Sequence, residues 1–397
     1  MIPPVSAAGS AAGDGSPAAL ARALLDTAHL TRTVPDRMRV APRVPFMPEQ
    51  LPSAQKSVDR ITDALGLPGL EVVAGPGRLT AVELAVSRRL ALGAPGAAGA
   101  DEPERAAQAA LAAFPGPAVV VPGRDGTPLR CWAAGPEDAP AVVVVSACGM
   151  PVGLAVRWLA ALAPEYRVVT WESRGLFAPD DGTALGELTD HTLDAQSEDV
   201  LAVLDGFGID HAHALGLCGG AVIALAAASR SDRITSLSLW HGDYELGDEA
   251  PKTTHQRDIE SLLAMVARGR SQAAGMHRLM SRPGTLEALR PDIAHYLIHP
   301  YATPELLYRY GLLNGAIMSA DCRRLLDAPQ PALVVTSDRD STAHPAGSAY
   351  VARHLPRAEL RTLPDGDHLT AFDAGGELVA LARQFLRSVT TPDRKGP

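Results

Sequence analysis

The chain has 397 residues, of which 46% are apolar and 20% charged, and its net charge is −9. This length and apolar content suffice for a large buried core, which excludes a mini-protein held together by disulfides or metal. The acidic balance excludes the basic field that would hold a nucleic-acid backbone. No stretch reaches the roughly 18 apolar residues needed to span a bilayer, and the first residues do not resemble a secretory signal, so we expect a cytoplasmic protein without membrane contact.

The N-terminal part is expected to be helical. Residues 1–16 are mostly Ala, Gly, Ser and Pro, a composition that buries too little apolar surface to offset its ordering entropy, so we expect a disordered tail. Over residues 17–115 apolar side chains recur at helical spacing, as in Leu20, Leu24 and Leu25, between Pro-rich joints. We therefore predict a helical N-terminal extension at 17–115.

From residue 116 the pattern changes to short β-rich runs that alternate with helical segments. Val142 to Val145 is an uninterrupted apolar run, typical of a strand buried on both faces. Such alternation predicts a mostly parallel sheet with helices on both faces. Between residues 250 and 324 the strands stop and helical patterns take over. We therefore expect an α/β core at 116–249 and 325–390, and an inserted helical cap at 250–324.

A candidate nucleophile lies between a strand and a helix. Cys218 is the centre of the stretch from Gly216 to Gly220, which follows an apolar strand and precedes an Ala-rich helix. A nucleophile elbow needs this context, because a strained turn lifts the side chain above the sheet and glycines let strand and helix approach closely. The alternative for so loose a pattern is a small buried cysteine.

Two later stretches offer an acid and a base. Asp340 follows a predicted strand and precedes Pro345, with Asp338 as the alternative acid. His368 follows the last predicted strand in a Gly-x-His turn. The order nucleophile, acid, histidine resembles that of the α/β-hydrolase superfamily over roughly residues 117–389.

Two further turns carry the same resemblance. The stretch from Glu172 to Gly175 resembles the family's Asp-x-Arg-Gly turn, and the stretch from Ser146 to Pro151 resembles the turn that supplies an oxyanion amide. The resemblance implies an α/β-hydrolase fold in which His368 takes the thiol proton and Asp340 orients its ring. It implies an oxyanion hole formed by the backbone amides of Cys148 and Gly219. No metal is expected.

A cysteine at the elbow favours a particular chemistry. It forms a thioester close in energy to that of a carrier protein's pantetheine, so transfer between thiols is nearly balanced. In this respect the chain resembles the cysteine-dependent aminoacyltransferases of nonribosomal peptide biosynthesis, of the syringomycin and coronamic acid type. The resemblance implies transfer of an acyl or aminoacyl group through Cys218 in secondary metabolism, no bound cofactor, and phosphopantetheine on a partner acyl or peptidyl carrier protein.

The predicted cap is consistent with an acidic partner. Residues 250–324 hold ten lysines and arginines against six acidic residues, in a chain whose total charge is negative. A basic cap would steer an acidic carrier protein, although a solvated surface is the alternative explanation.

Two other functions remain open. A cysteine hydrolase, either a thioesterase or an enzyme resembling dienelactone hydrolase, would use His368 to activate water and clear the thioester. A binding protein that kept the fold and lost catalysis is a third possibility, against which the complete Cys, Asp and His set argues.

Candidate substrate-binding residues follow strand ends at the carboxyl edge of the predicted sheet. His241, Asp243 and Tyr244 come directly after one strand, where α/β proteins place their ligands. If the substrate is an aminoacyl group, its ammonium requires an acidic partner, for which Asp243 and Glu172 are the candidates.

The four cysteines are too few for a disulfide framework and lack the spacing of a zinc ligand set. We expect reduced thiols, with Cys131 and Cys322 packed as small apolar side chains. Cys148 is a candidate for a regulatory disulfide with Cys218.

Overall fold

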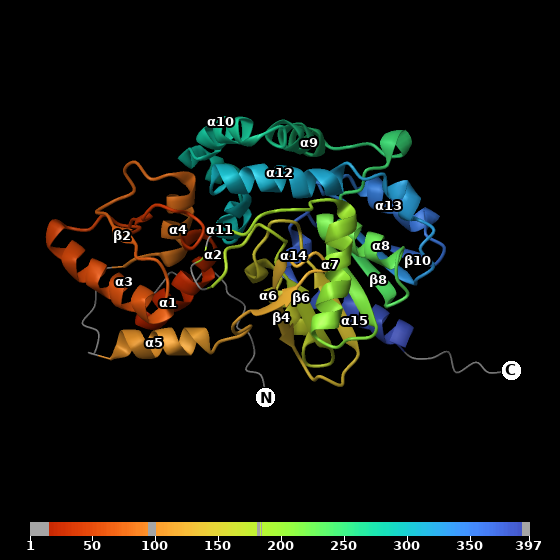
Figure 1. The fold of residues 1–397 in the computed structure, drawn as a ribbon, viewed down its shortest axis with the longest axis horizontal. Coiled ribbons are helices and arrows are strands. Elements are labelled where there is room, and N and C mark those ends of the chain that lie inside the picture. The colour runs from red at the N-terminus through yellow and green to blue at the C-terminus, as the bar shows by residue number, and fades with distance from the viewer. Residues whose placement is uncertain (1–15, 94–100, 181–182, 184, 391–397) are drawn as a thin grey trace. The chain divides into compact units, whose positions relative to one another are not determined.

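The computed structural model describes residues 16–93, 101–180, 183 and 185–390 (Figure 1). All of the predicted disordered tail except Ser16 lies outside these residues. The chain divides into two compact units. Unit 1 comprises Met1–Pro117, Phe177–Leu185 and Arg270–Leu307, and unit 2 comprises Ala118–Leu176, Gly186–Gly269 and Tyr308–Pro397.

Unit 1 is built mainly of helices, and two short strands pair in parallel. Ser16 caps the first helix by accepting from the Ala19 N–H at 3.2 Å, and Gly66 ends another with a left-handed φ of 64°. The helices are α1 (Pro17–Asp26), α2 (Ala28–Thr31), α3 (Leu51–Leu65), α4 (Ala81–Leu90), α5 (Glu102–Leu111), α10 (Arg270–Met280) and α11 (Ala294–Leu297), and the strands are β1 (Arg39–Val40) and β2 (Glu71–Val72).

Unit 2 contains an eight-stranded sheet in the order β10-β9-β8-β7-β5-β6-β4-β3. Strand β4 pairs antiparallel with both of its neighbours, β3 and β6, and the other neighbours pair in parallel. This confirms the predicted mostly parallel sheet. The strands are β3 (Val119–Pro122), β4 (Pro128–Ala134), β5 (Ala141–Val145), β6 (Arg167–Trp171), β7 (Ala212–Leu217), β8 (Ile234–Trp240), β9 (Ala332–Ser337) and β10 (Ala358–Leu363).

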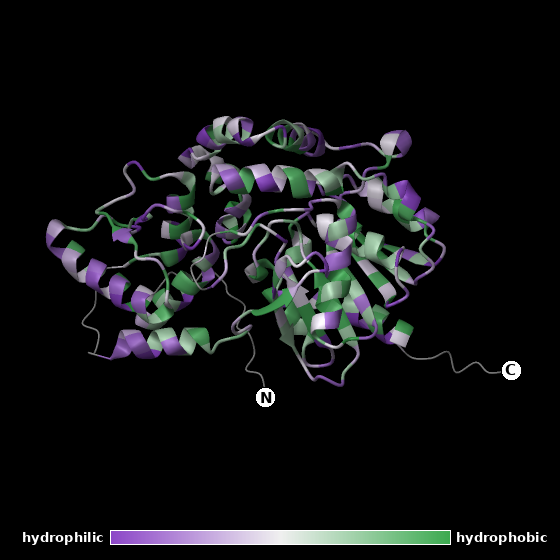
Figure 2. Ribbon diagram, viewed as in Figure 1, coloured by the Kyte–Doolittle hydropathy of each residue, from purple (hydrophilic) through white to green (hydrophobic). Residues whose placement is uncertain are grey.

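Two groups of helices pack together in unit 2. Helix α7 packs on α8, and helix α6 packs on α14 and α15. Helix α8 is buried along its whole length, and the central strands and α8 are predominantly hydrophobic in Figure 2. These helices are α6 (Val156–Leu162), α7 (Leu193–Gly206), α8 (Gly219–Ala228), α9 (Thr254–Val266), α13 (Pro345–His354), α14 (Thr370–Asp373) and α15 (Gly376–Thr390).

Helix α12 (Pro304–Met318) begins in unit 1 and continues into unit 2. The segment predicted as a cap at 250–324 is helical, and it contributes residues to both units. In the described part of the chain, no helix combines the length and the apolar character that crossing a bilayer requires.

Candidate active site

Cys218 lies at a sharp turn between β7 and α8. Its φ of 55° and ψ of −125° are rare for a residue with a side chain, and its N–H donates to the Trp240 carbonyl at 2.9 Å. The side chain is partly exposed although the flanking strand and helix are buried. Such strain held at one exposed thiol is the geometry of a nucleophile elbow.

Two glycines make this turn possible. A Cβ at Gly220 would lie 2.1 Å from the carbonyl oxygen of Val145, and a Cβ at Gly216 would lie 2.5 Å from the Cα of Ala221. Both distances are shorter than any packing allows, so β7, α8 and β5 approach this closely only because neither residue carries a side chain.

His368 connects Cys218 to a buried carboxylate. Its Nδ1 and an oxygen of Asp340 are 2.9 Å apart, and its side chain also interacts electrostatically with Cys218. Because Nδ1 is occupied by Asp340, Nε2 is the nitrogen that faces the thiol. Asp340 itself accepts from the N–H groups of Thr342 and Ala343 at 2.8 and 2.9 Å. The alternative acid, Asp338, is exposed and accepts instead from the N–H of Asp365.

His368 and Asp340 shift each other's pKa toward their charged forms. Burial is the largest influence on His368 and lowers its pKa, but the charge of Cys218 and the hydrogen bond to Asp340 outweigh it and hold the pKa well above its ordinary value. Burial raises the pKa of Asp340, yet the hydrogen bond and charge of His368 bring it below the ordinary value. The arrangement therefore favours a protonated His368 ring with the Asp340 carboxylate charged behind it.

The two predicted oxyanion donors have free N–H groups. Gly219 is the first residue of α8, where backbone N–H groups have no partner within the helix. Cys148 lies in the turn after β5. The N–H of the next residue, Gly149, donates to Ser173 Oγ at 3.0 Å. Among the described residues neither the Gly219 nor the Cys148 N–H has an acceptor. Both can donate to a developing oxyanion.

The four predicted substrate-binding residues differ in what they present. Both carboxylate oxygens of Glu172 are occupied, by Arg130 Nε at 2.9 Å and the Val152 N–H at 3.0 Å, and its side chain is 4% exposed. His241 is buried with both ring nitrogens hydrogen-bonded. Neither residue offers a free polar atom to a substrate.

Asp243 and Tyr244 each have a side-chain oxygen that can still accept a hydrogen bond. One oxygen of Asp243 accepts from Gln256 at 2.6 Å, and burial raises the pKa of this carboxyl to about 6. The Tyr244 hydroxyl is buried and has no hydrogen-bond partner in the described part of the chain. Burial, then the charges of Cys322 and Cys218, raise its pKa above the ordinary value. Tyr244 therefore lies within electrostatic reach of the elbow.

Sequence reasoning did not identify the residues that cover the elbow. A Cβ at Gly219 would lie 3.5 Å from Asn314 Oδ1 and 3.6 Å from Ile317 Cγ2, both on the part of α12 that belongs to unit 2. Asn314 is buried and its amide nitrogen donates to the Tyr310 hydroxyl. No local pattern signals this, because the contact joins residues nearly a hundred positions apart.

The histidines and the acid could in principle ligate a metal, since atoms of His241, Asp340 and His368 lie within 4.8 Å of one another. However, His368 Nδ1 is bonded to Asp340, and both nitrogens of His241 have protein partners. Hydrogen bonding accounts for this cluster, and the expectation of a metal-free site stays a prediction.

The cysteines are free thiols in the structure. Burial raises the pKa of Cys131, Cys148 and Cys322 to about 12, so these three are poor nucleophiles. The disulfide between Cys148 and Cys218 stays a hypothesis.

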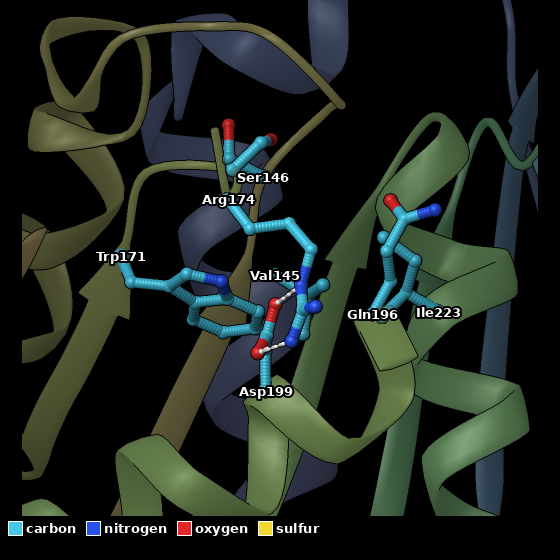
Figure 3. Close-up of a pocket in the computed structure, with 8 residues that line it drawn as sticks. Val145, Ser146, Trp171, Arg174, Gln196, Asp199 and Ile223 are labelled. Atoms are coloured by element: carbon cyan, nitrogen blue, oxygen red, sulfur yellow. Dashed lines mark hydrogen bonds and ion pairs between the residues drawn. The ribbon is translucent and has the colours of Figure 1, made fainter. Parts of the chain in front are cut away.

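The turn that resembles Asp-x-Arg-Gly has a structural explanation. The Arg174 guanidinium is 2% exposed and forms a two-point ion pair with Asp199 of α7 at 2.6 and 2.8 Å (Figure 3). Figure 3 shows the pair in a small pocket that is also lined by Ser146 and Gln196. Neither Cys218 nor His368 lines that pocket, so it is separate from the nucleophile.

Comparison with known proteins places these features in context. A profile of the α/β hydrolase fold family matches residues 140–374. The 3-oxoadipate enol-lactonase 1 of Acinetobacter baylyi is 23% identical over 274 residues, covering 68% of this chain and 97% of the relative. The L-allo-isoleucyltransferase of Pseudomonas savastanoi pv. glycinea is 27% identical over 175 residues, covering 43% of this chain and 61% of the relative.

Solved structures give the same fold. The enol-lactonase of Burkholderia xenovorans LB400 matches with a TM-score of 0.54 and 22% identity, over 68% of this chain and all of the other. A hydrolase from Pseudomonas aeruginosa PA01 matches with a TM-score of 0.54 and 24% identity, over 68% of this chain and 99% of the other.

Proposed function

The chain belongs to the α/β hydrolase fold family, and on that premise we propose that it is a cysteine-dependent acyltransferase, which moves an acyl or aminoacyl group between carrier-protein thioesters. The observation that carries the proposal is the series of interactions from Cys218 to His368, and from His368 by a hydrogen bond to Asp340. The relatives include a lactonase and an aminoacyltransferase, so the nature of the nucleophile bears on the choice between hydrolysis and transfer.

The first half-reaction loads the enzyme. The Cys218 thiolate attacks the carbonyl carbon of a donor thioester, and the N–H groups of Cys148 and Gly219 donate to the resulting oxyanion. The intermediate collapses with breakage of the carbon–sulfur bond to the donor. The His368 imidazolium gives its proton to the departing thiolate, which leaves a thioester on Cys218 and a neutral imidazole.

The second half-reaction reverses these roles. An acceptor thiol loses its proton to His368, and its sulfur attacks the carbonyl carbon of the Cys218 thioester. The bond to Cys218 then breaks, which restores the thiolate and the imidazolium. One thioester is exchanged for another, so the reaction needs no oxidant, reductant or metal.

Transfer rather than hydrolysis is supported by the sulfur at the elbow and by one relative. Exchange between two thioesters is close to balanced in free energy, whereas a serine would form a more stable oxyester. One relative is named as an aminoacyltransferase: the L-allo-isoleucyltransferase, which is 27% identical over 175 residues. The acyl donor and acceptor would be phosphopantetheine arms of carrier proteins. Exposed Arg257 on α9 and exposed Arg268, just after that helix, offer these carriers positive charge.

A cysteine hydrolase is the second candidate, because the 3-oxoadipate enol-lactonase is matched over 97% of its length. In that case His368 would deprotonate water instead of an acceptor thiol, and the acyl group would leave as a free acid.

The test follows a labelled acyl group. A loaded carrier protein is mixed with the enzyme and an empty second carrier, and the label is measured on the second carrier and in free acid. We expect label on the second carrier with the wild type, none with Cys218→Ala, and a shift toward free acid with Cys218→Ser. Free acid alone from the wild type would replace the transferase with the hydrolase, and wild-type turnover by Cys218→Ala would remove both.

A further inference from the structure

His241 occupies an unusual position beside the candidate base. It directly follows β8, its φ is 48°, and its side chain is 1% exposed. Its N–H donates to the Val335 carbonyl at 2.8 Å, which fixes the turn to strand β9. A left-handed φ is uncommon for residues that carry a side chain, so the fold holds this ring in place at some cost in backbone strain.

Both ring nitrogens of His241 have assigned partners. Nδ1 lies 2.9 Å from the main-chain carbonyl oxygen of His368, and Nε2 lies 2.9 Å from Ser337 Oγ. A carbonyl oxygen only accepts, so Nδ1 carries the proton and donates to it. Burial, the largest influence, and the charge of His368 lower the pKa of His241. The hydrogen bond to the His368 carbonyl and the charges of Asp340 and Asp367 oppose this shift only in part. The ring is therefore neutral, and its Nε2 accepts from the Ser337 hydroxyl.

These two bonds connect the segments that carry the acid and the base. Ser337 ends β9, and its carbonyl accepts from the N–H of Asp340 at 3.2 Å. A Cβ at Gly366, two residues before His368, would lie 2.4 Å from Ser337 Oγ. The acid segment and the base segment therefore meet at Ser337, and His241 bridges that point to the main chain of the base.

We propose that His241 is a positioning residue, which holds the main chain of His368 so that one ring nitrogen stays on Asp340 while the other faces Cys218. The proposal rests on the Cys218 chemistry proposed above. A buried histidine more often serves only to fill a core. Here the hydrogen bond ends on the backbone of the candidate base itself, and about an ångström of displacement at a reacting group slows catalysis strongly.

Asn is the matched conservative substitution. Its side-chain amide N–H can occupy the place of the Nδ1–H group and donate to the same carbonyl, and asparagine tolerates a left-handed φ better than most residues. His241→Asn thus keeps the bond to His368 and loses the bond to Ser337. His241→Ala loses both bonds, and Ser337→Ala loses only the hydroxyl.

The experiment measures acylation of the full-length enzyme by 4-nitrophenyl acetate, whose burst of 4-nitrophenolate reports acetyl transfer to Cys218. We expect His241→Ala to slow the burst by roughly tenfold or more with an apparent KM within about twofold of wild type, and His241→Asn to recover most of the rate. In His241→Ala, the alkaline limb of the pH profile should also move to lower pH, because His368 is no longer held against Asp340 and Cys218.

Two results would overturn the proposal: a wild-type burst in His241→Ala, or a loss that follows only the folded fraction with an unchanged pH profile. If His241→Ala does not fold, Ser337→Ala decides. Loss of the hydroxyl that holds Nε2 should slow the burst severalfold, and an unchanged rate and pH limb in this variant would reject a positioning role. Cys218→Ala separates the two proposals. A persistent burst in that variant would reject the Cys218 mechanism, whereas a lost burst there with normal His241 variants would reject this inference alone.

Discussion

Each compact unit contains a buried histidine hydrogen-bonded to an aspartate. In unit 1, His295 Nε2 lies 3.0 Å from Asp26, and in unit 2, His368 Nδ1 lies 2.9 Å from Asp340. The two pairs share their chemistry and almost their distance. What differs is the rest of the environment.

In unit 1, the aspartate of the His295–Asp26 pair has further hydrogen-bond partners from the protein. Asp26 also accepts from Arg89 and from the Tyr296 hydroxyl, so its charge is neutralised within the unit. Asp340 instead accepts from two backbone N–H groups, and its histidine reaches a partly exposed thiol. A histidine–aspartate pair thus stabilises structure when its charges are internally paired, and it can act as a base when a reactive group lies at the far nitrogen.

The largest expected difference comes from removing each histidine. His368→Ala should reduce acylation of Cys218 by about 10²–10⁴-fold, because no group remains to exchange a proton with the thiol. His295→Ala should leave the rate unchanged and lower the free energy of unfolding by about 1–3 kcal/mol, because Asp26 loses a buried partner. The burst assay and urea denaturation measure the two quantities. A comparable loss of rate in both variants would contradict the comparison.

Substitution of the two aspartates should give the same contrast, with Asp340 affecting the rate and Asp26 affecting stability. Asp340→Asn should slow acylation by roughly 10²–10⁴-fold, as expected when the orienting carboxylate of a triad is neutralised. Asp340 also helps to raise the pKa of His368, so the alkaline limb of the remaining activity should move to lower pH. A pH–rate profile of the variant checks the direction, and a limb displaced to higher pH would show that the carboxylate does not support the imidazolium.

Asp26 should affect stability with a defined pH dependence. Burial tends to raise its pKa, but His295, then Arg89 and Tyr296, bring it well below the ordinary value. A lowered pKa in the folded state adds stability above an unfolded pKa of about 3.9, and this contribution is lost as the pH falls through the folded pKa. Asp26→Asn should therefore be destabilised near neutral pH and approach the wild type as the pH falls. Thermal unfolding at several pH values measures this, and a constant difference would contradict it.

The smallest expected effects distinguish two tyrosines. The Tyr296 hydroxyl donates to Asp26, whereas the buried Tyr244 hydroxyl has no partner in the described part of the chain. Tyr296→Phe should cost about 1 kcal/mol of unfolding free energy, and Tyr244→Phe should leave stability equal or slightly higher, because an unsatisfied hydroxyl is removed. If the Tyr244 hydroxyl contacts the substrate, the same variant turns over more slowly. A marked loss of stability in Tyr244→Phe would show that the hydroxyl has a structural role.

The candidate site could be located from the sequence where local geometry restricts residue type. The elbow at Cys218 was visible because Gly216 and Gly220 allow no side chain, a requirement that leaves a motif. Asp340 and His368 were predicted from their order after successive strands. In the structure His368 is hydrogen-bonded to Asp340 and interacts with Cys218, and their catalytic roles stay a prediction. The choice between Asp338 and Asp340 needed coordinates, because a two-residue difference within one loop decides which carboxylate faces the ring.

The rest depended on packing between distant segments. Asn314 and Ile317 cover the elbow from α12, and no local pattern marks them. Glu172 was expected to offer a carboxylate to a substrate, but Arg130 and the Val152 N–H occupy it. The function of His241 depends on Ser337 and His368, which lie 96 and 127 positions further along the chain. Long-range hydrogen bonds of this kind leave no periodicity in the sequence.

Identification of the acylated residue tests the central claim most directly. The enzyme is mixed with a panel of acyl and aminoacyl N-acetylcysteamine thioesters, quenched in acid within the first turnover, digested, and its peptides are weighed by mass spectrometry. The account predicts that one or more donors add their acyl mass to the peptide containing Cys218, and that Cys218→Ala shows no adduct. Turnover accompanied by an adduct on another residue, or by none with any donor, would contradict it.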